Sequence, residues 1–400
     1  MSTDWTFSLY RNVRAAARGS YPFADVLSAA EARCAHEEIR RWPRYAPTPL
    51  LNLQETAARA AVRRVFYKNE ASRFGLGSFK ALGGAYAVAQ LLRSRLGHDL
   101  HRRVEAEELM NGAYRDMTSG ITVACASDGN HGRSVAAGAE LFGCGCTIFL
   151  HEGVSRGRER AIVNLGASVI RTAGNYDDSV RVARNACEAH GWFLVSDTAD
   201  DPAERTPLLI MQGYATLVIE TLEQLRAKGE AFPSHVFLQG GVGGLAAAVI
   251  AYLWETQGGS QTPIFVVVEP RRADCLYQSA ACGRPTPAKG DLQTLMAGLA
   301  CGEVSRVAWP ILWQGADFFL VVEDSAAVEC MRLLHRGAPG QASIVAGESG
   351  VAGLAGLLAV VYDPSDRART LLRLDGASTV LLIGTEGATD PEIFRSLVGP

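Results

Sequence analysis

The sequence predicts an α/β fold with a largely parallel sheet, helices on both of its faces, and two lobes. Short apolar runs alternate with longer amphipathic segments, which is typical of successive strand and helix units. Of the 400 residues, 48% are hydrophobic and 41 are glycine, which suffices for large buried cores and many tight turns. Four loops rich in glycine or reactive side chains follow expected strands, the position where such folds bind ligands.

The elements can be predicted in order along the chain. The first 45 residues or so indicate helix and irregular segments, and Pro47 and Pro49 then favour an extended segment, because a proline disfavours helix in the residue before it. A charged, less ordered connection is expected at 97–118. We expect strands at 65–68, 121–126, 146–150, 167–171, 192–195, 235–238, 263–268, 317–322 and 379–383. We expect helices at 86–96, 132–141, 156–165, 176–190, 208–228, 245–256, 325–335 and 347–361.

Composition narrows the classes of partner. The net charge is −3 with interleaved signs, which predicts neither a nucleic-acid nor a membrane partner and is compatible with a small polar or anionic metabolite. No apolar run approaches the roughly 18 residues of a membrane span, and the N-terminal residues lack a signal-peptide pattern. Nine scattered cysteines predict reduced thiols and a cytoplasmic protein, with Cys144 and Cys146 as buried small hydrophobes and not as metal ligands.

The first of the four loops contains Lys80, which lies between the pairs Gly75/Gly77 and Gly83/Gly84 just before a helical pattern. An ammonium group at the positive end of a helix dipole loses its proton more easily and becomes the nucleophile that Schiff-base chemistry needs. A lysine that extends along a helix surface to solvent is an equally good interpretation of the spacing alone.

The second loop is Ser127–Gly132. Its Gly129 and Gly132 let the backbone approach a ligand, and the following helix start suits an anion. Asn130 offers an amide to a phenolic or carbonyl oxygen, and Asp128 adds an acid. A capped turn would show the same pattern.

The third loop, Gln239–Gly244, exposes backbone N–H groups at a helix start and forms a candidate phosphate nest. No Lys-Ser/Thr pair follows, which argues against a P-loop, and no clear acidic ribose partner follows, so a monophosphate fits better than a dinucleotide. The fourth loop, Gly384–Asp390, carries two hydroxyls and two carboxylates, as a polar exit loop also could.

Together the loops resemble those of fold-type II pyridoxal-phosphate enzymes, the group of the serine/threonine dehydratases and tryptophan synthase β. The shared pattern is Ser78-Phe79-Lys80, then Ser-x-Gly-Asn-His-Gly at 127–132, then the glycine-rich turn, then a Ser/Thr-bearing loop late in the chain. Within this group the chain is similar to the diaminopropionate ammonia-lyase family, at segments 71–76, 80–84, 128–133, 211–214 and 385–390.

The resemblance implies two intertwined three-layer α/β/α lobes with the cofactor in the cleft between them. Residues 1–88 and 202–400 would form the large cofactor-binding domain, and 89–201 a small inserted α/β domain. A homodimer is implied in the same way.

The resemblance also implies roles for single residues. Lys80 would hold pyridoxal 5'-phosphate as an internal aldimine and then act as a base on Cα. The cofactor would further be bound by Phe79 beside its ring, by Asn130 at its phenolate oxygen, by Gly240, Gly241, Val242, Gly243 and Gly244 at its phosphate, and by Thr385 at its pyridine nitrogen.

For the substrate, the resemblance implies that Ser78 binds the carboxylate, while Asp128 and Asp197 hold the β-ammonium group and exchange protons with it. An aspartate would serve as base for the D-isomer, and Lys80 for the L-isomer. The implied reaction is α,β-elimination of 2,3-diaminopropionate through an aminoacrylate, giving pyruvate and two molecules of ammonia.

Three departures leave the substrate open. The family pattern has Asn where Gly77 stands, Trp-Glu-Gly-Tyr where 200–203 reads Asp-Asp-Pro-Ala, and Asp where Ala388 stands. A lyase for a substituted diaminopropionate, a serine/threonine dehydratase and a β-replacement enzyme are the alternatives within the fold. Outside it, a dinucleotide-binding oxidoreductase would use 240–244, and a cofactor-binding protein without turnover is a further interpretation.

Overall fold

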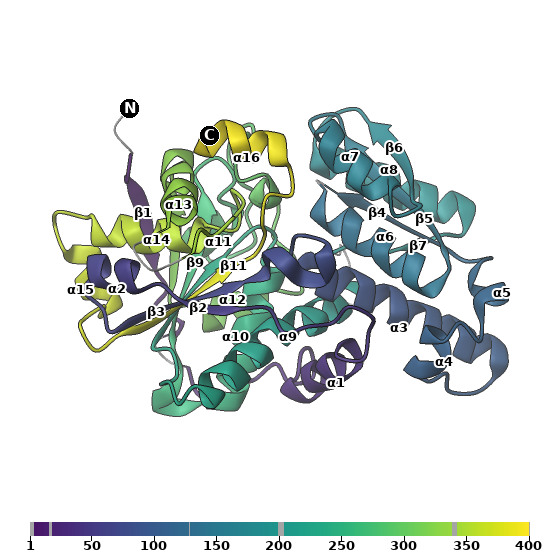
Figure 1. The fold of residues 1–400 in the computed structure, drawn as a ribbon, viewed down its shortest axis with the longest axis horizontal. Helices are drawn as coiled ribbons and strands as arrows, with labels where there is room; N and C mark the ends of the chain where they lie inside the picture. The colour runs from purple at the N-terminus through teal and green to yellow at the C-terminus, as the bar shows by residue number, and fades with distance from the viewer. Residues whose placement is uncertain (1–3, 16–17, 128, 199–203, 338–341, 400) are drawn as a thin grey trace.

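The computed structural model describes residues 4–15, 18–127, 129–198, 204–337 and 342–399. They form two sheets with helices packed around each (Figure 1). The larger sheet has seven strands in the order β1-β10-β9-β8-β11-β3-β2, and the smaller has four in the order β6-β5-β4-β7. The strands are β1 Phe7–Arg11, β2 Leu50–Asn52, β3 Arg64–Asn69, β4 Thr122–Ser127, β5 Gly145–His151, β6 Ser168–Thr172, β7 Phe193–Leu194, β8 His235–Gln239, β9 Ile264–Pro270, β10 Phe318–Val322 and β11 Thr379–Gly384.

The predicted α/β class is confirmed, and both sheets are largely parallel. The five inner strands of the larger sheet pair in parallel, as do all four strands of the smaller sheet. Strands β8, β10 and β11 are buried along their whole length, which explains their nearly unbroken apolar sequences. Only the edge strands β1 and β2 are antiparallel to their neighbours.

The expectation of helix and irregular segments over the first 45 residues is wrong for β1. Phe7–Arg11 pairs with β10, more than 300 residues further along the chain. A five-residue edge strand has a short, partly exposed pattern, so only its distant partner defines it as a strand.

The connection 97–118 is more ordered than predicted. Helix α3 continues to Leu100, and two short helices, α4 and α5, follow. The helices are α1 Ala29–Ile39, α2 Gln54–Ala60, α3 Lys80–Leu100, α4 Ala106–Met110, α5 Arg115–Thr118, α6 Asn130–Phe142, α7 Arg156–Val163, α8 Tyr176–His190, α9 Thr206–Ala227, α10 Gly244–Gln257, α11 Cys275–Cys282, α12 Trp309–Gly315, α13 Asp324–Arg336, α14 Ala352–Val361, α15 Arg367–Leu372 and α16 Pro391–Val398. Among the described helices, none combines the length and apolar character of a membrane span.

Helix α3 joins the two halves of the molecule, because it packs against α6 beside the smaller sheet and against α9 beside the larger one (Figure 1). Gly83 and Gly84 make this double packing possible. A Cβ on Gly83 would lie 2.4 Å from the ring of Tyr214, and one on Gly84 would lie 1.9 Å from Ser134 Oγ. The second glycine pair of the lysine loop therefore serves helix packing. The domain boundaries at 88/89 and 201/202 stay a prediction.

A buried ionic network anchors the chain just before the lysine loop. Glu220 on α9 accepts from Lys68 Nζ at 2.7 Å and from Arg73 Nη1 at 2.8 Å, and Arg73 Nε also donates to Glu70 Oε2 at 2.8 Å. All four side chains are at most 1% exposed. Two cations and two carboxylates thus balance each other away from water, between α9, β3 and the turn that leads to Lys80.

We expect Glu220→Gln to lower the free energy of unfolding by about 3–5 kcal/mol, because Lys68 and Arg73 would keep buried charges without their shared partner. Urea unfolding near neutral pH measures this change. Glu223→Gln is the matched control, since the Glu223 side chain lies on the same helix and is 50% exposed. Equal losses in both variants would contradict the role of the network.

The same network predicts a pH dependence of stability. Burial alone would raise the pKa of Glu220, but hydrogen bonds and charges from Arg73 and Lys68 outweigh burial and lower it to about 2. The folded-state pKa is therefore below that of the unfolded chain, about 4.3 for a free glutamate. The stabilisation is present above that value and is lost as the pH falls towards 2.

Candidate active site

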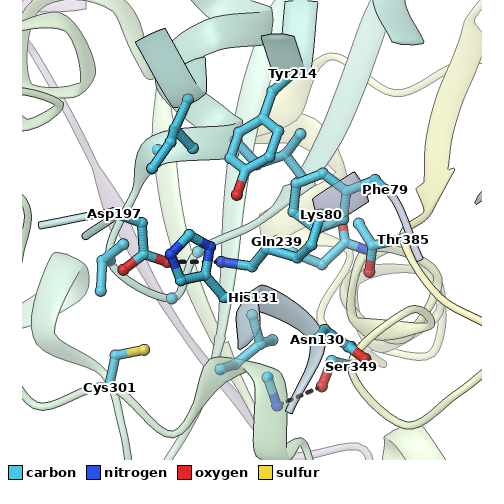
Figure 2. Close-up of a pocket in the computed structure, with 18 of the residues that line it drawn as sticks. Phe79, Lys80, Asn130, His131, Asp197, Tyr214, Gln239, Cys301, Ser349 and Thr385 are labelled. Carbon is cyan, nitrogen blue, oxygen red and sulfur yellow. Dashed lines mark hydrogen bonds and ion pairs between the residues drawn. The ribbon is translucent and has the colours of Figure 1, made fainter. Parts of the chain in front are cut away.

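A cavity lies where loops from both sheets meet (Figure 2). One part of its wall comes from the smaller sheet and its helices, at Asn130, His131, Tyr176 and Asp197. The other part comes from the larger sheet and its helices, at 239–242, 244–245 and 298–301 and at Ser349, Thr385 and Glu386. Lys80, at the start of α3, lines the same cavity and comes from the helix that joins the two halves.

Lys80 and Asp197 form the polar centre of this cavity (Figure 2). Lys80 Nζ donates to Asp197 Oδ2 at 2.7 Å, with the two side chains 17% and 8% exposed. Tyr176 donates its hydroxyl to the other carboxylate oxygen at 3.1 Å. Burial alone would raise the pKa of Asp197, but the Lys80 ammonium, His131 and the two hydrogen bonds outweigh burial and hold that pKa well below its usual range. Asp197 is therefore a fixed negative charge facing the lysine.

Aromatic rings cover one side of the lysine. Lys80 Nζ lies 5.8 Å from the ring centroids of both Phe79 and Tyr214. These two rings contact each other with their centroids 4.6 Å apart. The two rings form a partly apolar wall beside the Lys80 amine, and the amine also faces the cavity (Figure 2).

The glycine-rich turn after β8 forms another part of the wall. Gly240, Gly241, Val242 and Gly244 line the cavity, and α10 begins at Gly244 without a side-chain cap. A Cβ on Gly240 would lie 2.5 Å from Glu269 Cγ, and Gly243 has φ +98° with Leu312 Cδ1 only 2.7 Å from a built Cβ. The turn therefore requires glycine, and the uncapped N–H groups at the helix start suit an anion.

Asn130 and Thr385 also lie on the wall (Figure 2). Asn130 is the first residue of α6, and its Nδ2 donates to Glu386 Oε2. Thr385 directly follows β11 and is 4% exposed, and its carbonyl accepts from the Phe79 N–H at 2.9 Å. That backbone bond joins the end of β11 to the lysine loop, so the second and fourth loops meet the first at this cavity.

Two expected site residues do not line the cavity, and a third residue and the departing segment lie outside the described residues. Ser78 and Gly243 are not among the described residues that line the cavity. Ser78 is 2% exposed and forms a backbone bridge with Glu386 behind the wall. Asp128 and the departing segment 200–203 lie outside the described residues.

Sequence reasoning missed several residues of the wall. Tyr176 carried no local signal, because its contact with Asp197 joins the start of α8 to the end of β7. Glu386 and Tyr214 lay inside quoted motifs without an assigned role. His131 and Gln239 lay inside two of the four loops without a role, and His131 Nε2 lies 2.7 Å from the Val195 carbonyl oxygen. Cys301 and Ser349 are further wall residues that the sequence did not indicate.

These groups fit pyridoxal phosphate. The cavity presents a primary amine for an aldehyde, an uncapped helix start for a phosphate, and aromatic rings beside the amine. Gln239, which is 2% exposed, donates its amide to two backbone carbonyls, while its Oε1 has no hydrogen-bond partner among the described residues. An unpartnered buried acceptor on a cavity wall indicates that a ligand or water satisfies it.

The comparisons agree with this fit. Residues 42–385 match the model of a family described as "Pyridoxal-phosphate dependent enzyme". Diaminopropionate ammonia-lyase of Escherichia coli K12 is 41% identical over 374 residues, covering 93% of this chain and 92% of the relative. The crystal structure of the Escherichia coli enzyme with an aminoacrylate-PLP azomethine reaction intermediate has a TM-score of 0.87 at 38% identity, covering 99% of this chain and 97% of that one. The crystal structure of the same Escherichia coli enzyme in complex with D-serine has a TM-score of 0.88 at 37% identity, covering 98% of this chain and 97% of that one.

Fold and site therefore define a pyridoxal-phosphate-dependent enzyme of fold type II. Within that class, the chain belongs to the diaminopropionate ammonia-lyase family.

Proposed function

We propose that this protein catalyses the α,β-elimination of 2,3-diaminopropionate to pyruvate and two molecules of ammonia, with pyridoxal 5'-phosphate as cofactor. The observation that carries the proposal is the contact between Lys80 and Asp197, which places a nucleophilic amine and a fixed carboxylate beside a phosphate-binding turn. The 41% identity with the Escherichia coli lyase over most of both chains supports the choice of reaction.

When bound, the cofactor supplies an electron sink for negative charge at Cα of an amino acid. The chain would hold it through Lys80 at its aldehyde, through the 240–244 turn at its phosphate, and through Thr385 at its pyridine nitrogen. A threonine hydroxyl does not force protonation of that nitrogen, which suits elimination of a β-substituent. Phe79 would pack beside the ring, and Asn130 would donate to the phenolate oxygen.

Lys80 Nζ is the proposed base that removes the Cα proton of the L-isomer once the amine is free. Its position beside the Phe79 and Tyr214 rings, 5.8 Å from each ring centroid, holds the amine on the cavity wall where the substrate's Cα would lie. For the D-isomer, whose Cα proton faces the other side, Asp128 is the proposed base. Ser78 and the backbone around it are proposed to bind the substrate carboxylate.

Asp197 is the proposed partner of the substrate's β-ammonium group. Its carboxylate is buried and already satisfied by one ammonium group, that of Lys80. A β-ammonium can take the same place as a cation, whereas the β-hydroxyl of serine cannot neutralise the charge. Asp197 therefore favours diaminopropionate over hydroxy amino acids.

The test compares product formation from D- and L-diaminopropionate with that from D- and L-serine and L-threonine. We expect pyruvate and ammonia in a ratio of one to two from diaminopropionate, with a higher kcat/KM than for serine. A higher kcat/KM for serine or threonine would instead establish the dehydratase alternative, for which the D-serine complex of the Escherichia coli relative is the specific supporting observation. Turnover of neither substrate class, with the cofactor bound, would contradict the elimination itself.

We expect Asp128→Asn to lower kcat for the D-isomer by about 10²–10⁴-fold, because an amide cannot accept the Cα proton. The L-isomer is the internal control, since Lys80 is its proposed base and the variant leaves that residue in place. Stopped assays of pyruvate with each isomer measure the ratio. An unchanged rate with the D-isomer would remove Asp128 from the proposed mechanism.

We also propose a homodimer and a cytoplasmic location. The family resemblance supports the dimer, and the scattered spacing of the nine cysteines, which predicts reduced thiols, is compatible with a reducing compartment. Light scattering coupled to size-exclusion chromatography tests the assembly state, and a monomeric mass would contradict the dimer.

A further inference from the structure

Glu386 occupies the point where the second and fourth loops and the 347–350 turn meet. It is 2% exposed and lines the cavity directly after Thr385. Its backbone bridges Ser78 in the lysine loop, and the next residue, Gly387, donates its N–H to the Gly77 carbonyl at 2.9 Å. A side chain at this position is therefore held by the same backbone ladder that fixes the lysine loop.

The Glu386 carboxylate accepts two hydrogen bonds from two different parts of the chain. Oε1 accepts from the Ser349 N–H at 3.0 Å, and Oε2 accepts from Asn130 Nδ2. The first bond comes from the larger sheet's side of the cavity, and the second comes from the first residue of α6. Glu386 thus connects Asn130 to the opposite wall.

We infer that Glu386 is a positioning residue that fixes the orientation of the Asn130 side chain, so that this amide donates to the cofactor. The inference deepens the proposed function and rests on it. An ionised carboxylate only accepts hydrogen bonds, so it selects the Nδ2 end of the amide. Nδ2 carries two hydrogens, and the second remains for the phenolate oxygen that Asn130 is proposed to bind.

Packing leaves the carboxylate little freedom to move away. A Cβ on Gly347 would lie 2.8 Å from Glu386 Cγ, and one on Gly350 would lie 2.8 Å from the Glu386 carbonyl oxygen. The Gly347 N–H donates to that same carbonyl at 3.0 Å. The two glycines let the 347–350 turn close over Glu386, which keeps its two hydrogen bonds in one geometry.

Burial and nearby charged groups set the pKa of Glu386, and therefore the pH range in which its carboxylate only accepts hydrogen bonds. Burial raises its pKa to about 7, and the neighbouring Glu348 carboxylate adds to the rise, while Arg158 and the Asn130 hydrogen bond oppose it. Arg158 Nη2 in turn pairs with Glu348 Oε1 at 2.6 Å. Burial also raises the pKa of the Tyr67 phenol, on β3, so this neighbouring group is uncharged at neutral pH. Arg158 lowers the pKa of Glu386 but does not cancel the effect of burial, so the ionised, accepting form predominates above about pH 7.

The experiment is a double-mutant cycle on the holoenzyme with Glu386→Gln, Asn130→Ala and both together. Cofactor affinity is measured by equilibrium dialysis with pyridoxal phosphate, and the absorption maximum of the bound cofactor is recorded. We expect Glu386→Gln and Asn130→Ala each to weaken binding by about tenfold or more and to shift the band in the same direction. The double variant should bind the cofactor no more weakly than Asn130→Ala alone, because both substitutions remove the same contact, that of Asn130 with the cofactor.

Glu223→Gln is the control, since the Glu223 side chain is 50% exposed on α9 and pairs with His36, and it should leave cofactor affinity and band position unchanged. If Glu386→Gln does not fold, Glu386→Asp replaces it in the cycle, because the shorter side chain withdraws the carboxylate from Asn130. Additive effects in the cycle, or wild-type affinity in the Glu386 variant, would overturn the inference. Absence of cofactor binding by the wild-type protein would instead overturn the proposed function.

Discussion

Lys80→Ala is expected to abolish the absorption band of the lysine-bound cofactor at about 410–420 nm and to lower turnover by at least about 10³-fold. The reason is geometric, because Lys80 Nζ is the primary amine that lies in the cavity between the Asp197 carboxylate and the Phe79 and Tyr214 rings. Its replacement removes both the covalent anchor and the proposed base for the L-isomer. Absorbance spectra after incubation with pyridoxal phosphate, before and after borohydride reduction, measure the first effect.

Lys289→Ala is the control, because Lys289 is exposed. It should keep both the band and the activity, so that general effects of lysine removal are excluded. A wild-type spectrum without the band would contradict the proposed cofactor, and a band that persists in Lys80→Ala would place the anchor on another lysine.

Asp197→Asn is expected to lower kcat/KM for diaminopropionate by about 10²–10⁴-fold while the cofactor remains bound. Burial alone would raise the pKa of Asp197, but Lys80, His131 and Tyr176 hold it well below its usual range, so Asp197 is ionised in this arrangement. An amide of the same size keeps the shape and removes the charge that would hold the β-ammonium group. The absorption band should remain, because Lys80 still forms the anchor.

The comparison with serine sharpens this prediction. Any turnover of serine should fall much less in Asp197→Asn, because a β-hydroxyl does not need a counter-charge. Asp116→Asn, at an exposed position of α5, is the matched control and should behave as wild type. Equal losses with diaminopropionate and serine would assign Asp197 a role in folding or in general catalysis, and not in substrate selection.

The fold class could be predicted from the sequence because its signals are local, whereas Lys80 was predicted as the cofactor anchor only from the four loops taken together. Apolar runs such as Val236–Leu238 and Val380–Ile383 are long enough to define buried parallel strands, and these strands lie at the centre of the larger sheet. The turn at 240–244 needs glycine for its own backbone shape and close packing, so its pattern is visible without the rest of the chain.

Other features could not be predicted because their cause lies far away in the chain. β1 becomes a strand only through β10, and Tyr176 gains its role only through Asp197. The sequence shows a second glycine pair after Lys80 but no reason for it, whereas the structure shows that Gly83 and Gly84 serve the contacts of α3 with α9 and α6.

By itself, the sequence determined the α/β fold class, because apolar strands and amphipathic helices are local patterns. It also predicted a lysine anchor and a glycine-rich phosphate turn, from four loops that together resemble one family. Only the tertiary structure decided which side chains meet. Lys80 contacts Asp197 across 117 positions, and Asn130 contacts Glu386 across 256. Such pairs form because packed helices and parallel strands bring loop ends to one cavity, and no local pattern records which loops will face each other.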